Sequence, residues 1–169
     1  MQLVEVIEVG AGGAASIEFT SIPQDGVDLV CVMSLSGNFA TVPGASYAKI
    51  TFNADTGTNY NWLFLYGTGS TTASFSASST TSSRTPWIEN DNSGDFGSMS
   101  CYISNYASTA TKSISYDGVT EQNATAAQQT LIAGNYTGSS GISSMLIEPV
   151  QATLFSQYST ASLYKITAD

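Results

Sequence analysis

The stretch from Tyr47 to Gly69, YAKITFNADTGTNYNWLFLYGTG, contains two candidate strands joined by a polar segment. In the first half, Ala48, Ile50 and Phe52 alternate with polar residues, which is the two-residue period of a strand with one buried face. The second half, Trp62 to Tyr66, is apolar at every position. The Asn, Asp and Gly residues between the halves favour a turn. This stretch therefore predicts a β-hairpin whose second strand is covered on both faces, by a central sheet position or by a subunit contact.

Further short segments with a strand pattern follow one another along the chain. They lie at Val4–Ile7, Ser16–Ile22, Val27–Leu35, Met99–Tyr106, Lys112–Tyr116, Thr130–Ala133, Ile142–Glu148 and Ala161–Ile166. A spacing of about 8 to 12 residues between short strands is typical of a sandwich or barrel, and no segment shows a sustained helical period. We therefore predict an all-β fold, a single antiparallel β-sandwich of jelly-roll type over residues 14–169, with residues 1–13 as a short N-terminal arm.

Three segments are less regular. Ser70 to Arg84 is mostly Ser, Thr and Ala, with Phe75 as its one large apolar residue, and predicts an exposed strand followed by a loop. The pair Asp117-Gly118 predicts a tight turn after the preceding strand. Asn123 to Gln129 predicts a loop or a single helical turn, because it is nearly free of β-branched residues.

The charged residues exclude several classes of partner. The net charge is −9, and the four basic residues, Lys49, Arg84, Lys112 and Lys165, are spread singly, so the sequence offers no basic patch for phosphates. We therefore expect binding neither to nucleic acid nor to a membrane. No apolar run approaches the roughly 20 residues of a membrane helix, and the first residues lack the basic region of a signal peptide. These features predict a protein that is made in the cytoplasm and leaves it only with something larger.

The two cysteines, Cys31 and Cys101, each lie within an apolar alternation, where a free thiol packs as a small apolar group. Two cysteines do not form a disulfide framework. We predict buried thiols, and a bond between them only if their strands face each other at bonding distance.

The sequence contains no histidine and no thiol with an identifiable activating partner, so we predict that the protein is not an enzyme. Two segments carry oxygen ligands on alternate residues, one with Asp55 and Asn59 and the other with Asp91 and Asp95. Neither matches a calcium loop, which needs about six to eight oxygens and a closing glutamate. We therefore predict that these side chains cap their own turns, and that the protein binds no metal or cofactor.

The aromatic residues leave a carbohydrate-binding alternative open, because sugar faces stack on exposed rings. Most of them lie at strand positions, where packing in the core or against a subunit is expected. The candidates for a glycan site lie in or beside loops, and they are Tyr60, Trp87, Tyr106, Tyr136 and Tyr158.

Five segments carry a resemblance to a known family. They are AASIEFTSIPQ (Ala14 to Gln24), ITFNADTGTNY (Ile50 to Tyr60), YGTGS (Tyr66 to Ser70), YISNYAST with KSIS (Tyr102 to Ser115) and QYSTASLYKI (Gln157 to Ile166). Together they span nearly the whole chain and resemble a family of tailed-phage virion proteins. Its members occur as outer domains of longer tail-fibre chains and as small stand-alone structural proteins. The resemblance implies a surface jelly roll that decorates the capsid or binds a host, and a homotrimer.

Of these two roles, the sequence favours capsid decoration. A tail fibre usually carries an anchor and a repetitive stalk before its tip domain, whereas here only about ten residues precede the first core strand. We therefore expect a capsid decoration or cement protein on the outer surface of the virion, made in the cytoplasm of the bacterial host and bound to the major capsid protein.

The predicted partner contacts are Val4, Val6 and Ile7 in the arm, together with Trp62 and Phe64. The alternative function is that of a tail-fibre or receptor-binding protein, which would recognise host surface glycans through the loop aromatics.

Overall fold

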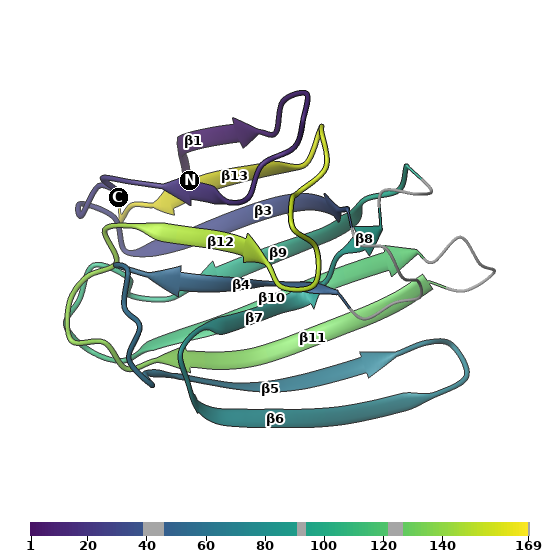
Figure 1. Ribbon diagram of the computed structural model, residues 1–169. Coiled ribbons are helices and arrows are strands. Elements are labelled where there is room, and N and C mark those ends of the chain that lie inside the picture. Colours follow the sequence, from purple (N-terminus) through teal and green to yellow (C-terminus); the bar gives the residue numbers. More distant parts are fainter. Residues whose placement is uncertain (39–45, 91–93, 122–126, 169) are drawn as a thin grey trace.

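The computed structural model describes residues 1–38, 46–90, 94–121 and 127–168. These residues form strands and no helix (Figure 1). The strands are β1 (Gln2–Glu8), β2 (Ile17–Phe19), β3 (Asp28–Gly37), β4 (Tyr47–Phe52), β5 (Tyr60–Gly67), β6 (Thr72–Thr80), β7 (Ser83–Trp87), β8 (Glu89–Asn90), β9 (Gly97–Ile103), β10 (Lys112–Glu121), β11 (Ala127–Tyr136), β12 (Met145–Pro149) and β13 (Thr160–Ile166). Over the same ranges there is no helix that could span a membrane.

Two sheets pack face to face. The larger sheet has the order β1-β13-β3-β9-β10-β11-β5-β6, with β8 pairing in parallel with β3 beside this path. The smaller sheet has the order β2-β12-β4-β7. In Figure 1 the larger sheet runs from β1 at the top to β6 at the bottom, with β12, β4 and β7 in front of it. The predicted all-β fold and antiparallel β-sandwich are confirmed, and the jelly-roll type stays a prediction.

The core lies between the sheets, where alternate residues of each strand point inward. A row of directly opposite side chains crosses the larger sheet, and each of its members is at most 3% exposed. From β13 to β5 the row consists of Leu163, Cys31, Cys101, Tyr116, Ile132 and Phe64. The smaller sheet covers it with fully buried residues that include Phe19, Ile50 and Phe52.

The predicted hairpin between Tyr47 and Gly69 is wrong, because β4 and β5 belong to different sheets. β4 pairs with β12 and β7, whereas β5 pairs with β11 and β6. The polar segment between them crosses from one sheet to the other, and Asn53 and Ala54 adopt positive φ angles of 54° and 53° there. Turns and crossovers use the same polar residues, so the sequence pattern suits both.

The predicted turn at Asp117-Gly118 is also wrong, because both residues lie inside β10. A Cβ atom added at Gly118 would lie 2.5 Å from the Cβ of Pro86 in β7, so glycine is needed here for close packing between the sheets. β7 is buried at every residue, and β6 before it has no buried residue. The prediction of an exposed strand after Ser70 is therefore confirmed, whereas the long loop predicted to follow it is wrong, because Ser83 and Arg84 already belong to β7.

The two cysteines are free and buried, as predicted. They are direct partners on the neighbouring strands β3 and β9. Burial raises the pKa of Cys31 well above its usual value and that of Cys101 to about 12, so both thiols stay protonated at neutral pH.

Two further predictions concern the N-terminal arm and the segment from Asn123 to Gln129. The arm residues form β1, which pairs with β13 of the same chain as an edge strand. Ala127, Gln128 and Gln129 belong to β11, so the predicted loop or single helical turn is wrong for these three residues. Residues 123–126 of that prediction lie outside the described residues.

The close contact at Gly118 generates a stability prediction. Gly118→Ala should lower the free energy of unfolding by about 1 to 3 kcal/mol, because its Cβ atom would force β7 away from β10. Gly67→Ala in β5 is the matched control, since the nearest atom to its added Cβ is 3.8 Å away. Urea unfolding of both variants measures the difference. Equal stability of the two variants would show that the packing between the sheets tolerates the methyl group.

Candidate functional site

The outer face of the larger sheet carries exposed apolar side chains on β5 and β11. Leu63 and Leu65 are 51% and 48% exposed, and Leu131 is 43% exposed. Leu131 lies directly opposite Leu65, and Ala133 lies directly opposite Leu63. The four side chains are therefore neighbours on one face, and we call this group the leucine strip.

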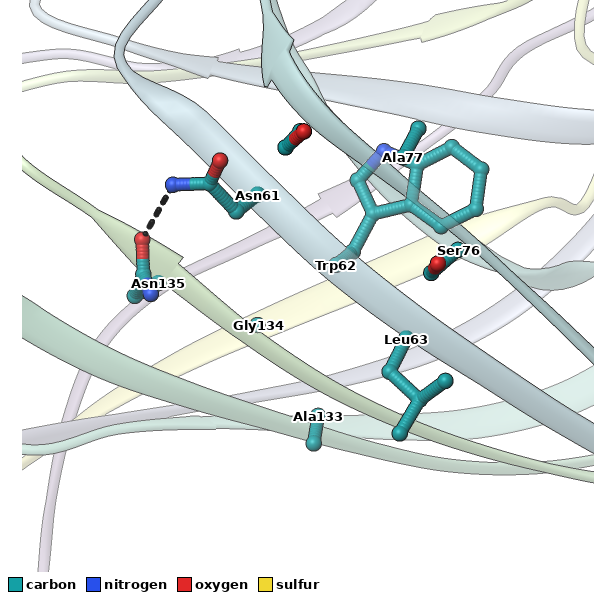
Figure 2. Close-up of a pocket in the computed structure, with 9 residues that line it drawn as sticks. Asn61, Trp62, Leu63, Ser76, Ala77, Ala133, Gly134 and Asn135 are labelled. Carbon is teal, nitrogen blue, oxygen red and sulfur yellow. Dashed lines mark hydrogen bonds between the residues drawn. The ribbon is translucent and has the colours of Figure 1, made fainter.

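A groove of about 430 Å³ lies at one end of the leucine strip, across β11, β5 and β6 (Figure 2). Its lining residues are Asn61, Trp62, Leu63, Ser76, Ala77, Ser78, Ala133, Gly134 and Asn135. The Asn61 Nδ2 donates a hydrogen bond of 2.8 Å to Asn135 Oδ1, and the Ser79 backbone N–H donates one of 2.9 Å to Asn61 Oδ1. These bonds fix the amides in place, so the groove offers oriented polar groups beside aliphatic side chains.

A second groove, of about 210 Å³, lies at the other end of the strip. It is lined by Leu65, Tyr66, Gly67, Thr72, Gln129 and Leu131. None of the described residues that line either groove is charged. Asp117 on β10 lies directly opposite Leu131 and borders the strip. An apolar centre with a polar border is the arrangement of a protein docking surface.

The predicted partner contacts on β5 lie on the other side of this strand. Phe64 is fully buried, and Trp62 projects to the side opposite Leu63 (Figure 2). Sequence reasoning found that both faces of this segment are apolar, but the two residues that it named point inward, where Phe64 is buried and Trp62 is partly buried. Because inward and outward residues alternate, Leu63 and Leu65 are the most exposed side chains of this strand.

The predicted contacts in the arm lie on β1. Val6 is 52% exposed, whereas Val4 and Ile7 are partly buried and pack against the core. Only Val6 of these three therefore presents most of its side chain to solvent.

A buried arginine lies among aromatic rings where β7 meets β5 and β6. The Arg84 guanidinium carbon is 3.6 Å from the ring centre of Tyr47, 4.8 Å from that of Phe64 and 5.3 Å from that of Phe75. No carboxylate of the described residues forms an ion pair with it. Burial lowers the pKa of Arg84 to about 10, and contact with Tyr47 offsets part of this effect. The cation therefore depends on ring contacts in place of a counter-ion.

The predicted turn cap at Asp55 is present. Its Oδ1 accepts a 2.8 Å hydrogen bond from the Gly57 backbone N–H, and its Oδ2 accepts bonds of 2.8 Å from Asn59 Nδ2 and 2.9 Å from the Tyr136 hydroxyl. Both carboxylate oxygens are thus used within the protein. Among the described residues there is no cluster of three or more acidic or Cys side chains that could hold a metal. Asp91 lies outside the described residues, and Asp95 is partly exposed.

Most of the predicted glycan residues are buried. Tyr60 and Tyr106 are fully buried, and Trp87 and Tyr136 are 7% and 2% exposed. Tyr60, Trp87 and Tyr136 lie at strand ends and pack in the core, so position beside a loop did not indicate exposure. Tyr158, at 62% exposed, is the remaining ring that a sugar could reach.

Comparisons of the chain with protein-family models, with curated proteins and with solved structures gave no significant match.

The Asp55 cap generates a pH-dependent prediction. Hydrogen bonds from Asn59, then from Gly57 and Tyr136, hold the pKa of the Asp55 carboxyl below its usual value. The stability that the ionised Asp55 contributes to the folded protein is therefore present above the unfolded-state pKa of this carboxyl. It is lost as the pH falls through the lower folded-state pKa. Asp55→Ala should cost about 1 kcal/mol near pH 7 and much less near pH 2. Urea unfolding at both pH values measures this, and a loss that does not change with pH would contradict it.

The Arg84 cluster generates a second stability prediction. Replacing Arg84 with Met keeps most of the packing volume and removes a buried charge that has no counter-ion in the described residues. Desolvation of such a charge outweighs ring contacts of about 0.5 to 2 kcal/mol. Thermal unfolding should therefore show Arg84→Met as stable as the parent chain or more stable, and Arg84→Ala as less stable because it leaves a cavity. A large loss in Arg84→Met would show that the ring contacts dominate.

Proposed function

We propose that this chain is a non-enzymatic structural protein of a tailed-phage virion, which binds the outer capsid surface as a decoration or cement protein. The resemblance of its sequence to phage virion proteins gives the biological setting. The observation that carries the proposal is the uncharged leucine strip, with a groove at each end, on the outer face of a broad sheet.

In the proposed mechanism, the leucine strip packs against the major capsid protein. The three leucines are each about half exposed, so covering them would contribute about 1 kcal/mol each. Micromolar binding needs about 8 kcal/mol, so the strip alone is too weak. Hydrogen bonds from Asn61, Asn135 and the serines of the larger groove would add affinity and direction.

The chain would stabilise the capsid because its binding site on the capsid is complete only after assembly. A site that spans several capsid subunits forms only in the assembled shell, so binding would stabilise the shell selectively. An oligomer of the chain would bring several strips to one capsid region and strengthen the attachment further. The net charge of −9 would limit association with other acidic proteins.

A pair of matched variants tests the proposed surface. Leu65→Asp places a charge in the centre of the strip, whereas Val32→Asp places the same charge on β3, at a position 48% exposed in the same sheet. Co-sedimentation with capsids that lack this protein should show at least about tenfold weaker binding for Leu65→Asp and unchanged binding for Val32→Asp.

Circular dichroism and thermal unfolding should show both variants folded, because both side chains are exposed. If Leu65→Asp binds capsids as well as the parent chain, the leucine strip is not the capsid surface. If the parent chain itself does not bind capsids, the proposed function is wrong.

A further inference from the structure

The two edge strands of the larger sheet differ in how they are protected. β1 carries Glu5 and Glu8 and has an irregular register between Leu3 and Glu5. β6, at the opposite edge, contains no charged residue, proline or glycine in its nine residues, and none of them is buried. Edge strands usually carry charges, prolines or bulges that block pairing with another chain. Over most of its length, β6 has none of these features.

The middle of β6 reads the same in both directions around Phe75. Residues 73–77 are Ala-Ser-Phe-Ser-Ala, and the symmetry of residue class extends from Ser70 to Thr80, with hydroxyl residues at every matched position outside the centre. In an antiparallel pair centred on Phe75, Ala73 would face Ala77 of the other strand, and Ser74 would face Ser76. Each side chain would thus meet one of its own kind on the same face of the sheet.

We propose that two copies of this chain associate through β6, in antiparallel pairing about a two-fold axis at Phe75, so that their larger sheets join into one. A two-fold contact is self-complementary by symmetry, and this requirement matches a palindromic strand. A strand from a different protein would place no such demand on the sequence of β6.

The packing around Phe75 supports a second copy of the chain as the partner of β6. Its ring stacks on Phe64 with centroids 4.5 Å apart and meets Trp62 edge-on at 5.9 Å, yet Phe75 is 39% exposed. In the proposed pair the two Phe75 side chains are direct cross-strand neighbours, about 5 Å apart at Cβ, so each covers the other. The aromatic cluster would then continue across the contact.

The local geometry of β6 sets the length of the contact. The register with β5 is regular from Thr72 to Ala77 and shifts beyond it, where Ser79 has a positive φ of 55°. The regular part includes the palindrome from Ala73 to Ala77. The pairing also keeps the contact itself uncharged, although each chain carries a net charge of −9, so added salt should strengthen the association by screening repulsion.

Sedimentation equilibrium of the chain without capsids tests the proposal. The parent chain should show a mass of twice 17.6 kDa, and Ser76→Lys should weaken the association at least about tenfold. Ser100→Lys is the matched control, because Ser100 is exposed on β9, a central strand that pairs on both sides.

A rescue variant tests the register. In the proposed pairing residue 74 faces residue 76 of the other copy, so Ser74→Glu combined with Ser76→Lys would place opposite charges face to face and restore the association. A parent chain that is monomeric at high concentration, a trimer that Ser76→Lys leaves intact, or a double variant that fails to recover would overturn the proposal. Because capsids are absent, these outcomes are separate from those that test the proposed function.

Discussion

The register of the larger sheet is the constraint on which the rest of the structure depends. The buried row from Leu163 to Phe64 exists only because six strands align the same face toward the smaller sheet. A slip of one residue in β10 would turn Tyr116 to solvent and bury Asp117 in its place. Burial of the row therefore fixes both what lies in the core and what lies on the outer face, and the leucine strip is the other side of the same alternation.

The unequal widths of the two sheets determine where the exposed surfaces lie. The smaller sheet covers the central strands, whereas β5 and β6 extend past its edge at β7 (Figure 1). Arg84, Trp87 and the aromatic residues of β5 fill this end from the inside. The outer face of β5 and the edge of β6 remain open to solvent. A capsid surface and a second copy of the chain would therefore use adjoining parts of the same end of the sandwich, which share Ser76 and Ala77.

Local sequence patterns predicted local structure, and contacts between distant residues decided the rest. Alternation within Val27 to Leu35 indicated β3 because each strand carries its own two-residue period. β4 pairs with β12, about a hundred residues away, and with β7, so the adjacent strand β5 only looked like its hairpin partner. The need for glycine at Gly118 comes from Pro86 on another strand. The site was predicted in part, because the apolar run in β5 was visible but the face that points outward depends on the register.

The copy number of this protein relative to the major capsid protein in purified virions is the most direct measurement of its proposed role. Quantitative mass spectrometry of virions from the phage that encodes the chain provides it. A decoration protein bound across the shell should be present in numbers comparable with the major capsid protein. A handful of copies per particle would place the protein at the tail or at a unique vertex, and its absence from virions would contradict a structural role.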